Sequence, residues 1–415
     1  MSPFTRTAAA AARGAWFAFH RPAFRDIGPA RKPRLLVDVS VIIRHDAATG
    51  IQRVVRAIWS ELSRAEHAGF DLVPVYASRS RGYCYANADF LECRRRAAHL
   101  PVGVRPGDKF LGLDLAAHFL PNCVQQLDAW REAGASIHLV VYDLLPLKEA
   151  DWFNPTTQEN FARWFEVVKS SADQVLCISD QVKRDVLDRI GRRRTPKVGR
   201  IYLSGDIARS RPSTGVTTEA TALLDRMRTR TTVLMVGTIE PRKGYNAALD
   251  AFDRLWRRDP LTSPDLVIVG KAGWKTEELQ SRVRNHPELG NRLHWLEDVS
   301  DESLSLFYEA CRGLLFASRG EGFGLPLAEA AVHGRWILAR DLAVFREQNL
   351  ANVLYFSGDD PDRLADKLIE LVATAARAAP PRIMLPSWSE CLEKLLDELG
   401  LGSHQISAQS IWVKG

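Results

Sequence analysis

The sequence predicts an α/β protein made of two doubly wound parallel-sheet domains that face a central cleft. The chain has 415 residues, more than one hydrophobic core usually supports, so two domains of ordinary size are expected. From Arg34 onward short apolar runs alternate with helical patterns, which is typical of parallel β-α-β units. These units form two series, and each series is therefore predicted to form its own Rossmann-like sheet.

The first series covers 34–204 and predicts the N-terminal domain. Helical patterns at 51–64 and 160–170 lie among the connections between its strands. Its expected strands are the apolar runs 35–43, 72–76, 110–113, 137–142 and 175–179.

The second series covers 231–380 and predicts the C-terminal domain. A polar stretch at 205–230 without a strand pattern separates the two series and is interpreted as the interdomain linker. Pro380 and Pro381 break the chain before an amphipathic helix at 387–399, so the segment 381–415 is a candidate to pack back on the first domain. The expected strands of this domain are 232–237, 266–270, 293–296, 313–317 and 336–339.

Composition narrows the class of protein. With 46% hydrophobic and 26% charged residues, the chain is typical of a globular protein. Its net charge of +6 is spread along the sequence without a nucleic-acid-binding signature, so no nucleic-acid partner is expected. The six cysteines include no C-x-x-C pair, which argues against a zinc site and a disulfide framework and favours a reducing, cytoplasmic location.

The N-terminal extension, 1–33, is basic and rich in aromatic residues. Arg13 interrupts what would otherwise resemble the apolar core of a signal peptide, which argues against export. Such a segment can lie along a membrane interface, and a frayed tail is the equally weighted alternative. No run approaches the roughly 20 apolar residues that a spanning helix needs. Peripheral contact with the cytoplasmic face of the inner membrane is therefore one hypothesis.

The most informative motif directly follows the strand expected at 313–317. Pro326 suits the first turn of a helix, so a helix is expected to begin at Leu325 or Pro326. Its free amides would attract an anion, and Gly322 and Gly324, on either side of Phe323, would let a ligand approach the backbone. This pattern predicts an anion-binding loop.

Two carboxylates belong to the same segment. Glu321 precedes the expected helix and Glu329 lies on it, so they suit different hydroxyl-rich parts of one ligand, such as a sugar and a ribose. The alternative is an ordinary Gly-Phe-Gly turn with Glu329 at the surface.

A second motif, Gly237-Thr238-Ile239-Glu240-Pro241-Arg242-Lys243-Gly244, follows the first strand of the second series. Arg242 can bind phosphate oxygens in a bidentate manner and Lys243 adds a compact charge, so the pair could neutralise a diphosphate. A solvated surface pair is the alternative. Its expected position at the same sheet edge as the Gly322 loop favours the phosphate site.

The first domain contributes two further candidates. Thr49 can cap the helix that follows the first strand, and Gly50 would let the backbone approach a phosphate. Asp143 ends another strand, where it could orient an acceptor hydroxyl or accept its proton. A plain capped turn and a turn aspartate are the respective alternatives.

These segments together resemble family four of the GT-B glycosyltransferases, over about residues 34–400. The resemblance rests on the Glu-x7-Glu pair, the Gly-Thr-Ile-Glu-Pro-Arg-Lys turn, the segment Gly270-Lys271-Ala272-Gly273-Trp274 and the segment Thr49-Gly50-Ile51-Gln52-Arg53. It implies a donor bound mainly by the second domain, with Glu321 at the transferred sugar, Glu329 on the ribose, and Arg242 and Lys243 on the diphosphate. Thr238 and Lys271 stand in the matching segments, so the resemblance makes them substrate-binding candidates as well.

The resemblance also implies retention of anomeric configuration, without metal or cofactor, through front-face attack assisted by the leaving phosphate. The sequence has no convincing Asp-x-Asp motif, consistent with that expectation. Three positions depart from the family pattern. Thr238 replaces a frequent arginine, Tyr142 replaces a frequent histidine before Asp143, and Gly320 replaces a bulkier residue, which predicts a more open sugar pocket.

Within the family, the residue sequences of the Thr-Gly-Ile-Gln-Arg and Glu-Pro-Arg-Lys motifs are most similar to those of bacterial mannosyl- and rhamnosyltransferases of O-antigen or capsule assembly. GDP-mannose is the favoured donor, with dTDP-rhamnose and UDP-sugars as alternatives, and a lipid-linked saccharide is the expected acceptor. A GT-B-fold epimerase or phosphorylase would share the cleft and would not need a separate acceptor. A non-enzymatic nucleotide-sugar binding protein is the least favoured hypothesis.

Overall fold

The computed structural model describes residues 32–78, 82–92, 99–191, 195–381 and 383–402. The proposed membrane-contact segment therefore lies almost entirely outside the described residues. Within the described part of the chain, no helix is both long enough and apolar enough to cross a membrane.

The first domain contains a seven-stranded sheet with the order β3-β2-β1-β4-β5-β6-β7, parallel except for the pairing of β2 with β3. All five runs predicted as strands in this domain overlap observed strands. β3 and β7 were not predicted, because each is an edge strand of four residues with little apolar pattern. The strands are β1 (Arg34–Asp38), β2 (Asp71–Ser78), β3 (Gly82–Tyr85), β4 (Lys109–Gly112), β5 (Ser136–Val141), β6 (Gln174–Cys177) and β7 (Lys197–Arg200).

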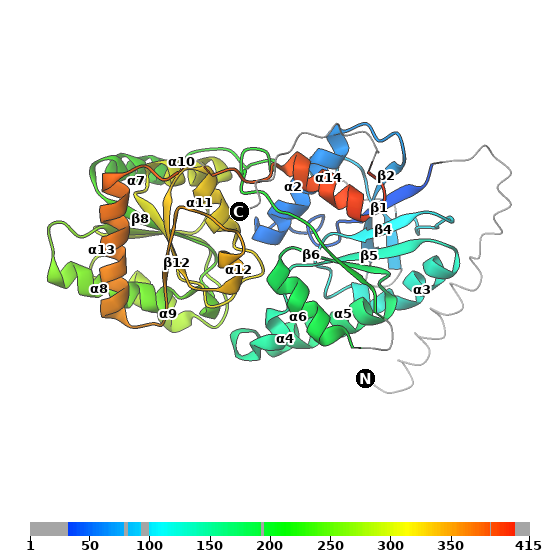
Figure 1. The fold of residues 1–415 in the computed structure, drawn as a ribbon, viewed down its shortest axis with the longest axis horizontal. Coiled ribbons are helices and arrows are strands. Elements are labelled where there is room, and N and C mark those ends of the chain that lie inside the picture. The colour runs from blue at the N-terminus through cyan, green and yellow to red at the C-terminus, as the bar shows by residue number, and fades with distance from the viewer. Residues whose placement is uncertain (1–31, 79–81, 93–98, 192–194, 382, 403–415) are drawn as a thin grey trace.

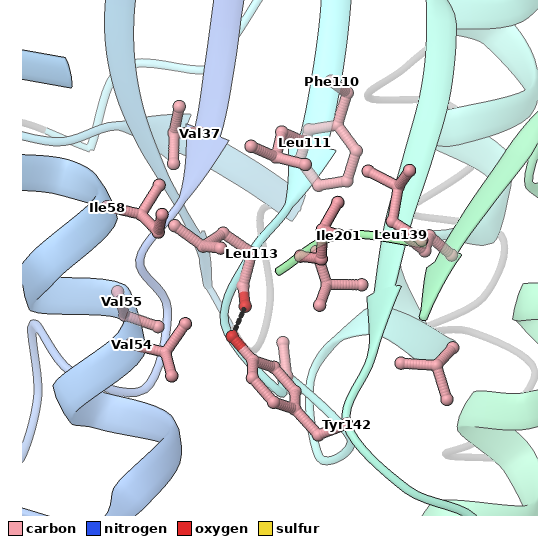
Figure 2. Packing of buried hydrophobic residues seen from close by; sticks show 14 of the residues in the cluster. Val37, Val54, Val55, Ile58, Phe110, Leu111, Leu113, Leu139, Tyr142 and Ile201 are labelled. Carbon is pink, nitrogen blue, oxygen red and sulfur yellow. Dashed lines mark hydrogen bonds between the residues drawn. The ribbon is translucent and has the colours of Figure 1, made fainter. Parts of the chain in front are cut away.

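Helices cover this sheet and bury an apolar core. Figure 2 shows Val54 and Ile58 of the helix α2 beside sheet residues such as Val37. The hydroxyl of Tyr142 donates to the carbonyl of Leu113 at 2.8 Å. The helices of this domain are α2 (Gly50–Arg64), η1 (Leu120–Asn122), α3 (Val124–Glu132), α4 (Leu145–Lys148), η2 (Ala150–Trp152), α5 (Pro155–Ser171) and α6 (Asp180–Ile190).

The second domain contains a six-stranded, all-parallel sheet with the order β10-β9-β8-β11-β12-β13. Its five predicted strands are present, and the edge strand β13 is an addition. The strands are β8 (Thr232–Val236), β9 (Asp265–Val269), β10 (Leu293–Leu296), β11 (Gly313–Phe316), β12 (Trp336–Arg340) and β13 (Val353–Phe356). The helices are α7 (Thr218–Thr229), η3 (Pro241–Lys243), α8 (Tyr245–Arg258), α9 (Glu277–Arg284), α10 (Asp301–Ala310), α11 (Leu325–Val332), α12 (Ala343–Arg346) and α13 (Pro361–Arg377).

Two helices, one in the predicted linker and one near the end of the described chain, show how the domains are connected. The helix α7 occupies the second half of the predicted linker, and its Leu223 and Met227 are buried in the core of the second domain. That part of the segment therefore belongs to the second domain. At the other end, α14 (Trp388–Glu398) packs against α2 of the first domain (Figure 1). The indole of Trp388 donates to the carbonyl of Asp206 at 2.8 Å.

Candidate active site

Two loops of the second domain meet at the carboxyl-terminal edge of its sheet. β8 and β11 are neighbours in the sheet, so the loops that follow them emerge side by side. The N–H of Arg319 in one loop donates to the carbonyl of Arg242 in the other at 2.7 Å. Gly244 has φ 73°, and a Cβ there would lie 2.3 Å from the carbonyl oxygen of Ala317. Glycine at this position therefore lets the loops approach closely.

Glu321 is the centre of a buried charged cluster formed by these loops. Its carboxylate oxygens lie 2.9 Å from Arg242 Nη1 and 2.6 Å from Lys243 Nζ. Arg242 also donates to the carbonyl of Gly320 at 2.9 Å, and its Nε lies 2.9 Å from Glu240. The four charged side chains are only 9–15% exposed. The structure thus brings together three of the predicted catalytic residues.

The electrostatic balance of the cluster differs from the prediction. Burial raises the pKa of Glu321, but the charges of Arg242 and Lys243 outweigh burial and lower this pKa to about 2. Burial in turn lowers the pKa of Arg242, while the carboxylates of Glu321 and Glu240 raise it, with a net upward shift. The sequence predicted two cations available to a diphosphate. In the structure both cations are already paired with Glu321.

Asp143 reaches this cluster from the first domain. A Cβ on Gly322 would lie 3.1 Å from Asp143 Cβ, so Asp143 lies against the Glu321 loop across the domain boundary. Burial raises the pKa of Asp143, and the charge of Arg242 opposes that shift. Its Oδ1 also accepts the N–H of Leu145 at 2.9 Å. Asp143 therefore has the turn role that the sequence left open, and it is also the fourth candidate residue at this contact.

Two glycines of the Glu321 loop touch the first domain instead of an open pocket. A Cβ on Gly322 would lie 1.9 Å from the carbonyl oxygen of Tyr142, and one on Gly320 would lie 2.8 Å from the ring of Trp152. The prediction that Gly320 leaves a more open sugar pocket is therefore wrong for this arrangement, because Trp152 and Leu145 fill that space. Gly322 likewise makes room for Tyr142.

The amino termini of α2 and α11 also face each other across the domain boundary. Thr49 caps α2 in a reciprocal arrangement with Gln52, which confirms the predicted cap. A Cβ on Gly50 would lie 3.3 Å from Leu325 Cδ1, so Gly50 lies against a side chain of the second domain. The helix α11 begins at Leu325 with Pro326 in its first turn, as predicted.

Gly324 and Phe323 shape the start of α11. Gly324 has φ 94°, and a Cβ there would lie 2.9 Å from ring atoms of Phe316 and Phe345. Its glycine is thus required by the fold, whether or not a ligand approaches. Phe323 is buried against the core of the first domain, and its carbonyl accepts the side-chain amide of Gln348 at 2.7 Å.

Glu329 has partners from both domains. It is 1% exposed, so the alternative of a surface residue is wrong. Arg53 of α2 donates to one carboxylate oxygen, and the hydroxyl of Tyr308 donates to the other at 2.9 Å. A ribose would have to reach a carboxylate that the first domain already covers.

The two remaining candidates lie at the edge of this region. A Cβ on Gly273 would lie 3.0 Å from the methyl group of Thr238, so Thr238 packs against the segment after β9. The ammonium of Lys271, with its side chain 52% exposed, lies 3.7 Å from Asp298. Lys271 is therefore placed on an exposed ion pair, apart from the Glu321 cluster.

Sequence reasoning assigned no role to three residues that contact this site. Arg53 stood in a recognised motif, and its place one turn after the Thr49 cap was a usable signal. Tyr308 and Asp301 lie on α10, outside every recognised motif, and Asp301 lies 2.5 Å from Arg53. No local pattern could have identified those two residues, because their importance comes from the domain contact.

Two facing parallel-sheet domains with a charged loop cluster between them define the GT-B class of fold. The solved structure of Anabaena HepE in complex with UDP and glucose matches with a TM-score of 0.58 and 16% identity, over 89% of this chain and 99% of that one. Sucrose-phosphate synthase from Thermosynechococcus elongatus matches with a TM-score of 0.57 and 18% identity, over 87% and 92%. These likenesses concern the fold, and they confirm the predicted fold class.

Residues 224–379 match the family described as Glycosyl transferases group 1. The serotype-specific mannosyltransferase WbdA of Escherichia coli is 39% identical over 379 residues, which are 88% of this chain and 45% of that protein. The O-antigen chain mannosyltransferase RfbU of Salmonella typhimurium is 33% identical over 127 residues, 31% of this chain and 34% of that protein. The second domain therefore matches the group 1 glycosyltransferase family that the resemblance predicted, and this chain spans about half the length of WbdA.

Proposed function

We propose that this protein transfers mannose from GDP-mannose to a growing saccharide, in the assembly of a bacterial surface polysaccharide such as O-antigen. The observation that carries the proposal is the Arg242–Lys243–Glu321 cluster at the domain contact of a group 1 glycosyltransferase domain. The 39% identity to WbdA supports mannose as the sugar. We further propose that the acceptor is lipid-linked and is reached at the cytoplasmic membrane face.

The proposed reaction retains the anomeric configuration and needs no metal ion. Arg242 and Lys243 would bind the diphosphate and stabilise the negative charge that builds on the departing nucleotide. The diphosphate would compete with Glu321 for these two cations, because both are paired with its carboxylate in the structure. Glu321, released in part, would then accept hydrogen bonds from sugar hydroxyls.

The remaining roles follow from position. Glu329 would accept hydrogen bonds from the ribose hydroxyls at the far end of the donor. Asp143 lies on the first-domain side of the cluster, where it would orient the acceptor hydroxyl. A leaving-phosphate oxygen would take the proton of that hydroxyl as the new glycosidic bond forms on the face from which the nucleotide departs.

A thermal-shift panel with EDTA present tests the donor and the metal independence together. A ligand that binds only the folded protein raises its melting temperature by mass action. We expect GDP and GDP-mannose to raise it more than dTDP-rhamnose, UDP-sugars or their nucleotides do. A rise in melting temperature with UDP or dTDP ligands alone would show that GDP-mannose is not the donor. A rise that is seen without EDTA and lost in its presence would overturn metal independence.

Acceptor dependence separates the transferase from the enzymatic alternatives. A GT-B-fold epimerase or phosphorylase would consume its substrate without a second saccharide. We expect GDP-mannose turnover to require a mannose-containing acceptor. Equal consumption of GDP-mannose with and without acceptor would contradict the transferase proposal.

A further inference from the structure

One arginine of the first domain joins two carboxylates of the second. Arg53 donates through Nη1 to Glu329, and its Nη2 lies 2.5 Å from an oxygen of Asp301. The second oxygen of Asp301 accepts the N–H of Ser213 at 2.9 Å and its hydroxyl at 3.1 Å. The second oxygen of Glu329 accepts from Tyr308. Glu329 is thus held by Tyr308 of its own domain, Asp301 is held by Ser213 of the connecting segment, and Arg53 holds both carboxylates from the first domain.

This contact is buried, so its charges are weakly screened. The side chains of Arg53, Asp301 and Glu329 are 11%, 4% and 1% exposed. Burial lowers the pKa of Arg53, but the two carboxylates outweigh burial and raise it, so the guanidinium stays charged. Removing one partner of such a pair leaves an uncompensated buried charge, which favours separation of the two surfaces.

The proposed function gives the ribose site to Glu329, whose carboxylate is covered by Arg53 in the structure. We propose that Arg53 is a positioning residue that acts through Glu329: it holds the two domains together without donor and must release Glu329 for the nucleotide ribose to bind. This inference rests on the proposed function. Donor binding and the domain contact then compete for one carboxylate.

Arg56 provides a matched control on the same helix, one turn further along. Its Nη1 lies 2.6 Å from Asp46, and its Nη2 lies 3.7 Å from the second oxygen of Asp301. Arg56 thus shares with Arg53 the residue type, the helix and one carboxylate partner, but its two ion pairs are with Asp46 and Asp301 and not with Glu329. We expect Arg56→Ala to weaken the domain contact while Arg53 still covers Glu329.

Titration calorimetry with GDP and with inorganic pyrophosphate tests the inference in the full chain. In Arg53→Ala, we expect GDP to bind roughly fivefold or more tightly than in the wild type, the lower end of typical coupling between sites. Pyrophosphate has no ribose, so its affinity should change much less. Arg56→Ala should leave both affinities within about twofold, and Arg53→Lys, which keeps the charge but not the two-armed geometry, should fall between.

Steady-state kinetics add a second readout. Arg53→Ala should lower KM for the nucleotide sugar and also lower kcat, because the domain contact that aligns donor and acceptor is weaker. Thermal unfolding of each variant checks that it is folded. Unchanged or weaker GDP binding by folded Arg53→Ala would overturn the inference, as would equal tightening of GDP and pyrophosphate. Failure of the wild type to bind any nucleotide would instead overturn the proposed function.

Discussion

Glu321 and Glu329 belong to one loop and helix, yet the structure holds them in different ways. Glu321 is paired within its own domain, with Arg242 and Lys243 of the neighbouring loop. Glu329 is paired across the domain boundary, with Arg53. When the domains separate, the first carboxylate therefore keeps both of its ion-pair partners, whereas the second loses Arg53 and keeps the hydrogen bond from Tyr308. The proposed phosphate-binding cations are therefore paired within the second domain, while the proposed ribose-binding carboxylate depends on how the domains sit together.

The largest expected effect comes from breaking the pairing within the domain. Arg242→Ala and Lys243→Ala should each lower the transfer rate on the order of 10²-fold or more, as when a preorganised charge stabiliser is removed. The rate should be measured at saturating nucleotide sugar. Arg319→Ala is the control, since Arg319 lies on the same loop but forms an exposed ion pair with Asp359. Unchanged turnover in either variant would remove the phosphate assignment.

A smaller loss of transfer rate is expected from a substitution that prevents the domain contact and leaves the charged residues intact. In Gly322→Ala the new methyl group would lie 1.9 Å from the carbonyl oxygen of Tyr142. The domains could not then reach this arrangement, so acceptor-dependent kcat should fall roughly tenfold or more, as for other misalignments of reacting groups. Calorimetry should show GDP affinity retained or increased, because Glu329 is no longer held by Arg53 when the domains cannot close on each other. Gly69→Ala is the neutral control, because among the described residues no atom beyond its chain neighbours lies within 4 Å of the added Cβ.

A double-mutant cycle can measure how much the Arg53–Glu329 pair across the domain boundary contributes to the free energy of unfolding. Arg53→Met and Glu329→Gln, singly and together, should give an interaction energy of about 1–3 kcal/mol in denaturant unfolding, since coupled buried partners are strongly non-additive. The exposed pair Lys367–Glu370, with 41% and 46% exposure, should give less than about 0.5 kcal/mol. Equal interaction energies for the two pairs would contradict the claim that the domain contact is tightly made.

The same comparison explains what could be predicted from the sequence. The turn at Thr49 and the start of α11 at Leu325 depend on neighbouring residues, so local patterns found them. The sequence predicted that Arg242 and Glu321 share one sheet edge, and the structure adds that their strands are neighbours, so the loops emerge together. Arg53 and Glu329 are 276 residues apart in different domains. No periodicity or motif spacing connects them, so their contact required the structure.

The strand β7 and the helix α7 were not predicted, because the first is a short edge strand and the second lies in a segment with turn-forming residues. β7 begins with Lys197 and ends with Arg200, and it carries little of the apolar run that marks a buried strand. α7 lies in a segment whose first half has turn-forming residues, and these concealed the apolar face of its second half. The glycines at 320 and 322 were expected to leave space for a ligand. The sequence could not show that the first domain, and not a ligand, occupies that space.

The smallest expected effect concerns pH and separates two carboxylates of the same contact. Glu321, with a pKa of about 2, stays ionised throughout pH 5–9 and should give no titration there. Burial raises the pKa of Asp143, so this side chain becomes neutral at a higher pH than an ordinary carboxyl does. If ionised Asp143 orients the acceptor, kcat/KM should fall as the pH drops through that raised pKa. Asp143→Asn should lower the neutral-pH rate a few-fold and remove the acid limb, whereas an unchanged acid limb would assign it to another group.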